Sequence, residues 1–487
     1  MLSFFMLHIE LYLVLQICFL VILGVILREI KFMNKFKFDV THLIYIYICL
    51  ILFGCLIILW FSLFFEAVLF NYQLVLDQLS FFFKFLTLLM AFFVFIFSYN
   101  YNKYEKIKTY EYLLLLLLSI VGMLSMISSY DFLTMYLSIE LQTLCFYIVA
   151  SIKLHSMYSI EAGLKYFILG ALSSCILLFG ISIIYGFTGI TNFSDLMILF
   201  NYNNMNTFNL NNYKAILLGI IFVYCGLFFK VGIVPFHLWL VDIYHGAPSN
   251  IVIFFAVVPQ FSIISLLIRL NVIFVYSYWY YIQIFFMVLG LLSITVGTIG
   301  AIYQVKLRRI LGYSTINNMG YLLCLLSTLD IESLFAAIFY LLVYNIIAIS
   351  LWSFVLTIRN RSTGNTFTDI RDLFYLYNSD KFLGIYFCII LFSAMGVPPL
   401  LGFFSKLYFF INILNWKMYI FTIYILLLNS ISSFYYLRLI QYMFSKPTDK
   451  QIFIEDPGQI RVFFMIMLLF IHIFFFFISN TYNINYT

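Results

Sequence analysis

Long runs of apolar residues, separated by short polar breaks, fill the chain from end to end. Most runs reach about 18 residues, the length an α-helix needs to cross a hydrocarbon core about 30 Å thick. They are continuous, whereas the strands of a membrane barrel would alternate in short segments. The pattern predicts an all-α integral membrane fold with about fourteen transmembrane helices, over residues 4–27, 43–70, 79–98, 112–128, 132–150, 164–186, 215–237, 250–270, 277–302, 310–328, 333–357, 382–411, 418–437 and 462–479.

The basic residues between these runs alternate in number from one break to the next. Loops after odd-numbered helices hold 20 of the 26 lysines and arginines, and loops after even-numbered helices hold only Lys214, Arg269 and Lys417. Because basic loops stay on the cytoplasmic or matrix side, both termini are expected on the opposite side. The net charge of +6 then follows from topology and requires no nucleic-acid partner.

Composition supports a membrane location and argues against several kinds of site. The chain is 65% hydrophobic and 9% charged, far from the soluble average of roughly 25% charged. Its eight cysteines lie in predicted helices without CxxC spacing, so we expect small buried residues and no haem, iron–sulfur or zinc site. The six histidines are scattered and form no i, i+4 pairs on a predicted helix, which argues against a metal site; they are His8, His42, His155, His237, His245 and His472. The abundance of Phe, Tyr, Ile and Asn is typical of an AT-rich, organelle-encoded gene.

Two ionisable residues fall in the middle of predicted helices five and seven. A charge at mid-bilayer costs about 2.5–3.5 kcal/mol, so Glu140 and Lys230 are functional candidates. Pro235 follows Lys230 by five residues, lacks an N–H and should break helix seven beside the lysine. Non-helical backbone at that depth requires protein or a water-filled cavity around it.

Helix twelve repeats this arrangement. Pro398 and Pro399 should interrupt it shortly before a third buried charge, Lys406. Two broken helices five spans apart predict an internal repeat, which is inverted because a five-helix unit starts its copy on the opposite side. We expect the first repeat over 112–270 and the second over 277–437, preceded by helices one to three in 1–111 and followed by a basic loop and the last helix in 438–487.

Other polar residues in the predicted helices can be explained by a structural role alone, without a function in proton transfer. Lys84, Glu10 and Glu66 lie near the ends of their predicted spans, and Lys84 can reach the interface by snorkelling. Several uncharged polar residues inside predicted helices could form a chain of groups that passes protons, but hydrogen bonding between helices explains them at least as well. These residues are Ser173, Ser174, Gln260, Ser262, Ser314, Asn317 and Asn318.

The same stretches resemble the antiporter-like family of membrane subunits of respiratory NADH:ubiquinone oxidoreductase (complex I), most closely the subunit 2 branch. The resemblance spans roughly residues 75–440. Lys406 favours that branch, since other branches usually carry glutamate there. The segments that carry it are Leu137–Thr143, Lys165–Ser174 with Tyr185–Gly189, Phe229–Trp239 with His245–Pro248, Arg309–Tyr321, and Gly396–Lys406.

Carried over by position, the resemblance implies that Glu140 is the coupling carboxylate, Lys230 the lysine of helix seven and Lys406 the exit-side residue of helix twelve. One position departs from the family pattern. A central lysine usually follows a proline on helix eight, and here Gln260 follows Pro259. Glutamine can order water but cannot hold a proton, so either water bridges the centre or this chain's own pathway is weakened.

The resemblance implies a proton-translocating subunit without a redox centre, in a complex that uses FMN, iron–sulfur clusters and ubiquinone elsewhere. Its partners would be other complex I membrane subunits, including neighbouring antiporter-like ones, and lipids. The expected location is the mitochondrial inner membrane, with both termini on the intermembrane-space side. A cation/proton antiporter component and a non-pumping membrane scaffold remain the alternatives.

Overall fold

The computed structural model describes residues 8–32, 40–62, 66–105, 107, 109–153, 155–201, 210–328, 330–358, 368–376, 380–445 and 459–483. Its chain divides into two compact units, residues 1–231 with 246–280 and residues 232–245 with 281–487. Each of the fourteen predicted spans overlaps a helix of the structure. The basic residues at 35, 37, 106, 108, 359, 361, 446 and 450, which contributed to the predicted orientation, lie outside the described residues.

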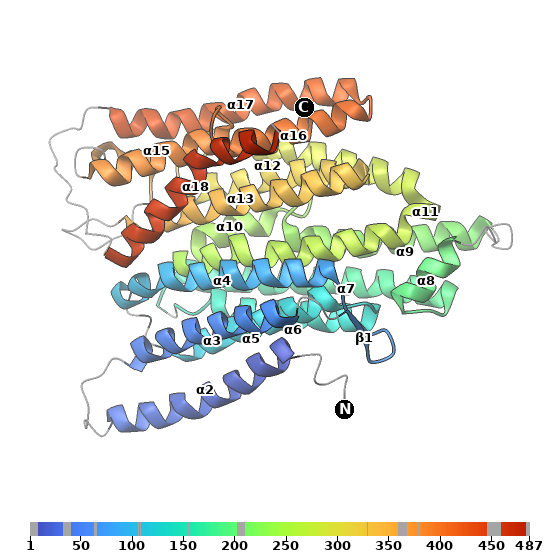
Figure 1. The fold of residues 1–487 in the computed structure, drawn as a ribbon, viewed down its shortest axis with the longest axis horizontal. Coiled ribbons are helices and arrows are strands. Elements are labelled where there is room, and N and C mark those ends of the chain that lie inside the picture. Colours follow the sequence, from blue (N-terminus) through green and yellow to red (C-terminus); the bar gives the residue numbers. More distant parts are fainter. Residues whose placement is uncertain are drawn as a thin grey trace. The chain divides into compact units, whose positions relative to one another are not determined.

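The first unit consists of long, roughly parallel helices (Figure 1). The most extensive packing is between α7 and α9, and α5 also packs closely along α6. One 18-residue stretch in the first part of α11 is completely buried, so this helix forms the core of the unit. The elements of the unit are α2 (His8–Phe32), α3 (Val40–Ser62), β1 (Ala67–Leu69), β2 (Leu74–Leu76), α4 (Gln78–Tyr104), α5 (Glu111–Ser128), α6 (Phe132–Ala150), α7 (Met157–Thr188), α8 (Phe193–Asn201), α9 (Leu210–Val231) and the first part of α11 (Ser249–Tyr303).

The predicted all-α membrane fold is confirmed, and a short hairpin corrects only the end of the predicted second span. Within the apolar run 43–70, α3 covers the described residues up to Ser62, and residues 67–69 form β1, which pairs antiparallel with β2 in the register Ala67 to Leu76. The turn places Phe70, Asn71 and Tyr72 at positive φ. Asp77 then caps α4 by accepting a hydrogen bond of 2.9 Å from the Ser80 backbone N–H, which satisfies a free donor at the helix start.

The second unit is also helical. Its central helix, α13, packs against α12, α15, α16 and α18. The unit contains α10 (Leu238–Gly246, up to residue 245), the second part of α11, α12 (Leu307–Thr328), α13 (Ile331–Thr357), the short 3₁₀ helix η2 (Ile370–Tyr375), α15 (Lys381–Met395), α16 (Leu401–Asn415), α17 (Tyr419–Phe444) and α18 (Gln459–Asn483).

The predicted break between spans eight and nine is absent. Helical backbone runs from Ser249 to Tyr303, because residues 271–276 contain no glycine or proline to end it. Two spanning stretches nevertheless lie in α11, at Ser249–Phe274 and Ser277–Tyr303. Eleven helical stretches in the described chain are long and apolar enough to cross a membrane. The other predicted spans fall on α12, on the α15–α16 pair and on α18, which are more polar or shorter.

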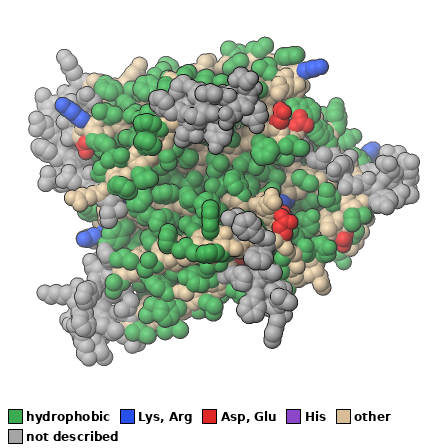
Figure 2. Space-filling model, viewed as in Figure 1, with side chains coloured by type: hydrophobic (Ala, Val, Ile, Leu, Met, Phe, Trp, Pro, Cys, Tyr) green, Lys and Arg blue, Asp and Glu red, His purple; other side chains and the backbone are tan. Residues whose placement is uncertain are grey.

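The face of the molecule in Figure 2 is covered mainly by hydrophobic side chains, with few charged ones. Large apolar side chains such as Leu15, Trp60 and Phe61 are more than half exposed. A soluble protein rarely exposes apolar area on this scale. The surface is therefore that of a multi-pass membrane protein.

Candidate functional site

Lys230 lies at the predicted break of helix seven. α9 ends at Val231, one residue beyond the lysine, and Gly232 turns the chain with φ of 83° before α10 begins at Leu238. This φ lies in the left-handed region that favours glycine, and a Cβ at Gly232 would also displace the end of the Leu240 side chain, 2.5 Å away. The break that Pro235 predicted is confirmed, and Gly232 is an additional cause of it.

The Lys230 side chain is buried, with only 9% of its surface exposed. In the described part of the chain its Nζ has no hydrogen-bond partner, and it lies 5.9 Å from the centre of the Phe229 ring. The carbonyl groups at the end of α9 form the negative end of the helix dipole, which favours a cation. The Lys230 ammonium is therefore stabilised by the end of its helix and by nearby charges, and not by a hydrogen bond among the described residues.

Glu140 lies on α6 and is half-buried. Its Oε1 atom is buried without a hydrogen-bond partner among the described residues, and its carboxylate acts electrostatically on Lys230. α7 contacts both α6 and α9. It approaches α9 so closely that a Cβ at Gly226 would lie 2.6 Å from Leu177 Cβ. The structure thus places the predicted carboxylate within electrostatic reach of the predicted lysine, in the same unit.

Gln260 lies in the buried core of the first unit. It follows Pro259 within α11, and 7% of its surface is exposed. No lysine takes its place on this part of the helix, where the next charged residue is Arg269. Arg269 does not fill the role, since its guanidinium is held by Asp77 at 2.6 Å. The centre of this unit therefore carries a polar but non-ionisable side chain.

Lys406 lies beyond the break in helix twelve. α15 ends at Met395, Gly396 takes a φ of 88°, and α16 begins at Leu401 after Pro398 and Pro399. The Lys406 ammonium donates to the Met395 carbonyl at 2.7 Å and to Asn429 Oδ1 at 2.8 Å. Both acceptors are neutral, so no carboxylate among the described residues contacts the ammonium. The predicted interruption of this helix is confirmed.

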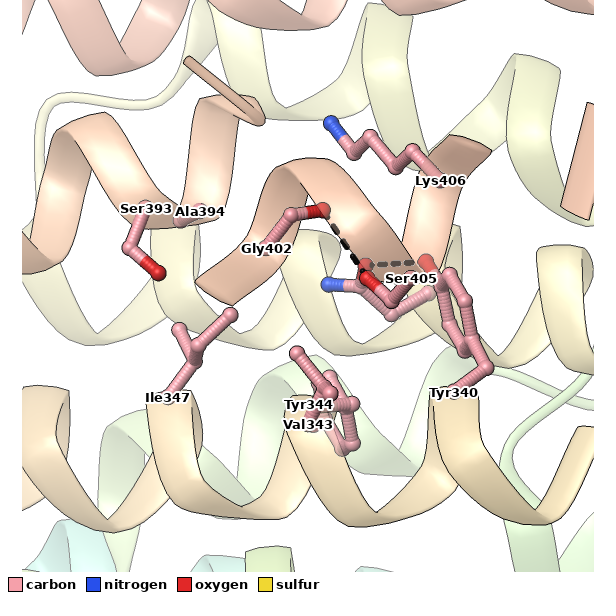
Figure 3. Close-up of a pocket in the computed structure, with 10 residues that line it drawn as sticks. Tyr340, Val343, Tyr344, Ile347, Ser393, Ala394, Gly402, Ser405 and Lys406 are labelled. Atoms are coloured by element: carbon pink, nitrogen blue, oxygen red, sulfur yellow. Dashed lines mark hydrogen bonds between the residues drawn. The ribbon is translucent and has the colours of Figure 1, made fainter. Parts of the chain in front are cut away.

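A small cavity adjoins Lys406 (Figure 3). Its volume is about 20 Å³, and one water molecule needs about 10–15 Å³. Figure 3 shows Ser393 of α15 at one side of Gly402 and Lys406 of α16 at the other, with Tyr340 of α13 below them. Tyr340 donates to Asn318 Oδ1 at 2.8 Å, so Asn318, one of the predicted polar residues, does line a polar cavity beside a buried lysine.

Most of the other predicted polar residues make structural hydrogen bonds within their own helix. Each serine hydroxyl donates to a carbonyl of its own helix, and such bonds leave the hydroxyl proton engaged locally. Asn317 is buried on α12, and its Oδ1 has no hydrogen-bond partner in the described chain. The serines with this local bond are Ser173, Ser174, Ser262 and Ser314.

Lys84 and Glu10 form a buried ion pair that the sequence did not predict. Lys84 Nζ lies 2.5 Å from Glu10 Oε1, with exposed side-chain fractions of 1% and 11%. Lys84 therefore does not snorkel to the interface, because Glu10 of α2 neutralises it across the bundle. Glu66 is exposed just before β1, in agreement with a position near the end of a span and no role in proton transfer.

Lys84→Met should destabilise the chain by about 3–5 kcal/mol, because it leaves the Glu10 carboxylate buried and unpaired. The double variant Glu10→Gln with Lys84→Met should recover much of this loss. Thermal unfolding of the purified protein in detergent measures both effects. Lys165→Met is the matched control, since Lys165 makes an exposed pair with Glu161 at 2.8 Å, worth about 0.3–0.5 kcal/mol. Equal losses for Lys84→Met and Lys165→Met would contradict the assigned pair.

Sequence reasoning missed two polar neighbours of the second unit's lysine. Asn429 of α17 accepts from Lys406, and an asparagine in an apolar helix was the available signal. His472 of α18 is fully buried between serines of two other helices. It was set aside because the six histidines show no i, i+4 pairing, but a single histidine in the last predicted span was itself unusual.

Comparisons with known proteins agree with this geometry. The family model described as "NADH:quinone oxidoreductase/Mrp antiporter, TM" matches residues 129–432. The chain is 41% identical over 329 residues to NADH-ubiquinone oxidoreductase chain 2 of Marchantia polymorpha, covering 67% of this chain and 65% of that one. It is 36% identical over 411 residues to NADH-quinone oxidoreductase subunit N of Pelagibacter ubique, covering 82% and 84%.

A solved structure of respiratory complex I from Thermus thermophilus with bound aureothin contains a chain of the same fold. The TM-score is 0.73 at 25% identity, over 93% of this chain and 96% of that one. The family match includes both broken helices and all four predicted site residues, Glu140, Lys230, Gln260 and Lys406. The chain therefore belongs to the NADH:quinone oxidoreductase/Mrp antiporter family of membrane proteins.

Proposed function

We propose that this chain is a proton-translocating membrane subunit of an NADH:ubiquinone oxidoreductase, in which Glu140, Lys230, Gln260 and Lys406 carry the pathway. The observation that supports it most is the buried Lys230 ammonium, which ends a broken helix without a hydrogen-bond partner in the described chain. A structural lysine would normally be paired, as Lys84 is. The proposal is also supported by the names of two similar proteins, NADH-ubiquinone oxidoreductase chain 2 of Marchantia polymorpha and NADH-quinone oxidoreductase subunit N of Pelagibacter ubique.

Charge coupling supplies the mechanism. When Glu140 is ionised it favours the ammonium form of Lys230, and when Glu140 is neutralised that support is lost and Lys230 releases its proton. Lysine suits the role because its proton affinity moves with its surroundings, whereas arginine would stay charged. Gln260 holds water in the path but carries no proton itself, and Lys406 serves the second unit.

The energy comes from outside this chain. Moving one charge against 100 mV costs about 2.3 kcal/mol, and we propose that ubiquinone reduction elsewhere in the complex supplies it. The chain itself holds no redox centre, while FMN and iron–sulfur clusters belong to other subunits. We place the chain in the mitochondrial inner membrane beside other antiporter-like subunits, organelle-encoded, with both termini on the intermembrane-space side.

Glu140→Gln tests the proposal in the assembled complex. The amide keeps the size of the carboxyl group but cannot ionise, so proton uptake per NADH oxidised should fall while assembly is retained. Proton uptake and NADH oxidation are measured together in sealed vesicles, with Glu161→Gln as the control at an exposed carboxylate. An unchanged ratio in Glu140→Gln would favour the non-pumping scaffold, for which Gln260 is the best support.

The subunit composition of the purified assembly distinguishes this proposal from the antiporter alternative. Mass spectrometry of the detergent-solubilised assembly should find flavin- and iron–sulfur-binding subunits together with this chain. Their absence would overturn the assignment to an oxidoreductase and leave a cation/proton antiporter component.

A further inference from the structure

His472 lies outside the residues that the family model matches. It is fully buried on α18, the last helix, which packs against α13, α15 and α16. Its Nε2 lies 3.1 Å from Ser350 Oγ of α13, and its Nδ1 lies 3.2 Å from Ser393 Oγ of α15. Both nitrogens of one buried imidazole are thus bonded to hydroxyl groups on two different helices.

Hydroxyl partners leave the protonation state of the ring open. A neutral imidazole donates from one nitrogen and accepts at the other, an imidazolium donates from both, and a serine hydroxyl can donate or accept. The Ser350 hydroxyl donates to the Ile346 carbonyl of its own helix at 2.7 Å, and in this position its oxygen accepts from Nε2. By turning away from Ile346 it could donate to the ring instead, so both tautomers and the charged form can be satisfied without moving heavy atoms. A carbonyl or carboxylate partner would have fixed one form, so this arrangement is suited to passing a proton through the ring.

The Ser393 side of the histidine leads to Lys406. Ser393 lines the same cavity as Lys406, and the cavity has room for a water molecule. Apart from Glu332 and Lys381 at helix starts, Lys406 is the one charged side chain on the three helices that surround α18. Their other ionisable groups are tyrosines and Cys388. Lys406 is therefore the group with which His472 can exchange a proton.

The Ser350 side leads away from the cavity. Ser350 lies closer to the C-terminal end of α13 than the α13 residues that line the cavity, Tyr340 to Ile347. Ser353 and Tyr386 hydrogen-bond to each other at 3.0 Å just beyond it. In the orientation expected from the basic residues, this end faces the basic loops, the side from which protons would be taken up.

We propose that His472 is a proton relay between Ser350 and Lys406, an additional residue of the pathway that rests on the proposed function. A proton arriving from the side of the basic loops binds Ser350 Oγ as the Ser350 hydroxyl passes its own proton to Nε2, so that Ser350 remains a neutral hydroxyl, and the ring releases its Nδ1 proton to Ser393. The Ser393 hydroxyl gives its own proton to a water in the cavity, which protonates a neutral Lys406 amine. No bond between heavy atoms forms or breaks, and one proton is transferred in total.

His472→Gln distinguishes a proton relay from a purely structural role of His472. The amide can still donate to one serine and accept from the other, but it cannot take up a proton. NADH-driven proton uptake by the assembled complex should fall by about tenfold or more. Ser430→Ala is the control, because it removes an exposed hydroxyl of α17 that donates to the Leu427 carbonyl of its own helix, and it should retain wild-type uptake.

Serine variants keep the test decisive if His472→Gln disturbs folding. Ser393→Ala should lower uptake like His472→Gln, and Ser393→Thr, which keeps the hydroxyl, should restore it. If His472→Gln or Ser393→Ala assembles and shows wild-type uptake, the proposal is overturned. It is also overturned if neither variant assembles, because His472 would then have a purely structural role. Loss of uptake in Glu140→Gln with normal uptake in His472→Gln would refute only the relay, whereas normal uptake in both would refute the proposed function.

Discussion

Lys230→Met should reduce NADH-driven proton uptake by about a hundredfold or more, at the scale of losing a positioned proton donor. Methionine fills a similar volume but carries no proton. The substitution should not destabilise the chain, because the Lys230 ammonium is buried without a hydrogen-bond partner in the described residues and removing such a charge relieves a desolvation cost. Loss of uptake with unchanged or higher stability is therefore the expected result.

The control for this variant lies on the same helix. Lys214 is exposed near the start of α9, so Lys214→Met removes the same charge from the same helix without touching the site. Proton uptake, NADH oxidation and thermal stability should be compared for both variants in reconstituted vesicles. If Lys230→Met pumps normally, or if it loses stability to the same extent as uptake, the role assigned to Lys230 is wrong.

The sequence predicted the helices well because the membrane imposes one solution on apolar runs of spanning length. The break between α5 and α6 was correctly placed at Ser128 to Asp131, where Asp131 caps α6 by accepting from the Leu133 N–H. The errors occurred where apolar residues took another backbone conformation. β1 consists of apolar residues that continue the run of α3, and hydropathy alone does not distinguish strand from helix over so few residues.

Single residues of the site were predictable, but their partners were not. Lys230, Glu140 and Lys406 were identified because ionisable groups are costly in an apolar helix. Whether such a group is paired depends on packing between helices far apart in sequence. Glu10 reaches Lys84 from a helix 74 residues away, and His472 reaches Ser350 across 122 residues. The predicted repeats and domain boundaries stay predictions, although both broken helices turn at a glycine with positive φ.

The two breaks differ in where they place the lysine. Lys230 precedes the turning glycine of helix seven, at the end of α9, whereas Lys406 follows that of helix twelve, within α16. The Lys230 ammonium is therefore stabilised by the carbonyl end of its own helix, whereas the Lys406 ammonium is stabilised by a hydrogen bond to the Met395 carbonyl at the end of α15. Both ammonium groups thus lie at the C-terminal end of the first half of a broken helix, despite different positions in the chain.

Gly402→Ala should cause the largest structural loss in the second unit. A Cβ at Gly402 would lie 1.9 Å from the Ser393 backbone oxygen and 2.9 Å from its carbonyl carbon. Since backbone cannot turn aside as a side chain can, α15 and α16 must separate. Such overpacking should cost at least about 3 kcal/mol, the upper part of the usual range. The shift would also move Ser393 away from His472 and open the cavity beside Lys406, so stability and proton uptake should fall together.

Gly186→Ala is the control for this glycine, because a Cβ there meets no atom within 4 Å. Alanine favours a helix by about 1 kcal/mol over glycine, so Gly186→Ala in α7 should be neutral or stabilising. Thermal unfolding in detergent would rank the two variants. Similar stability of Gly402→Ala and Gly186→Ala would show that the two halves of helix twelve are not packed backbone to backbone, and the geometry assigned to Ser393, the cavity and Lys406 would then have to be abandoned.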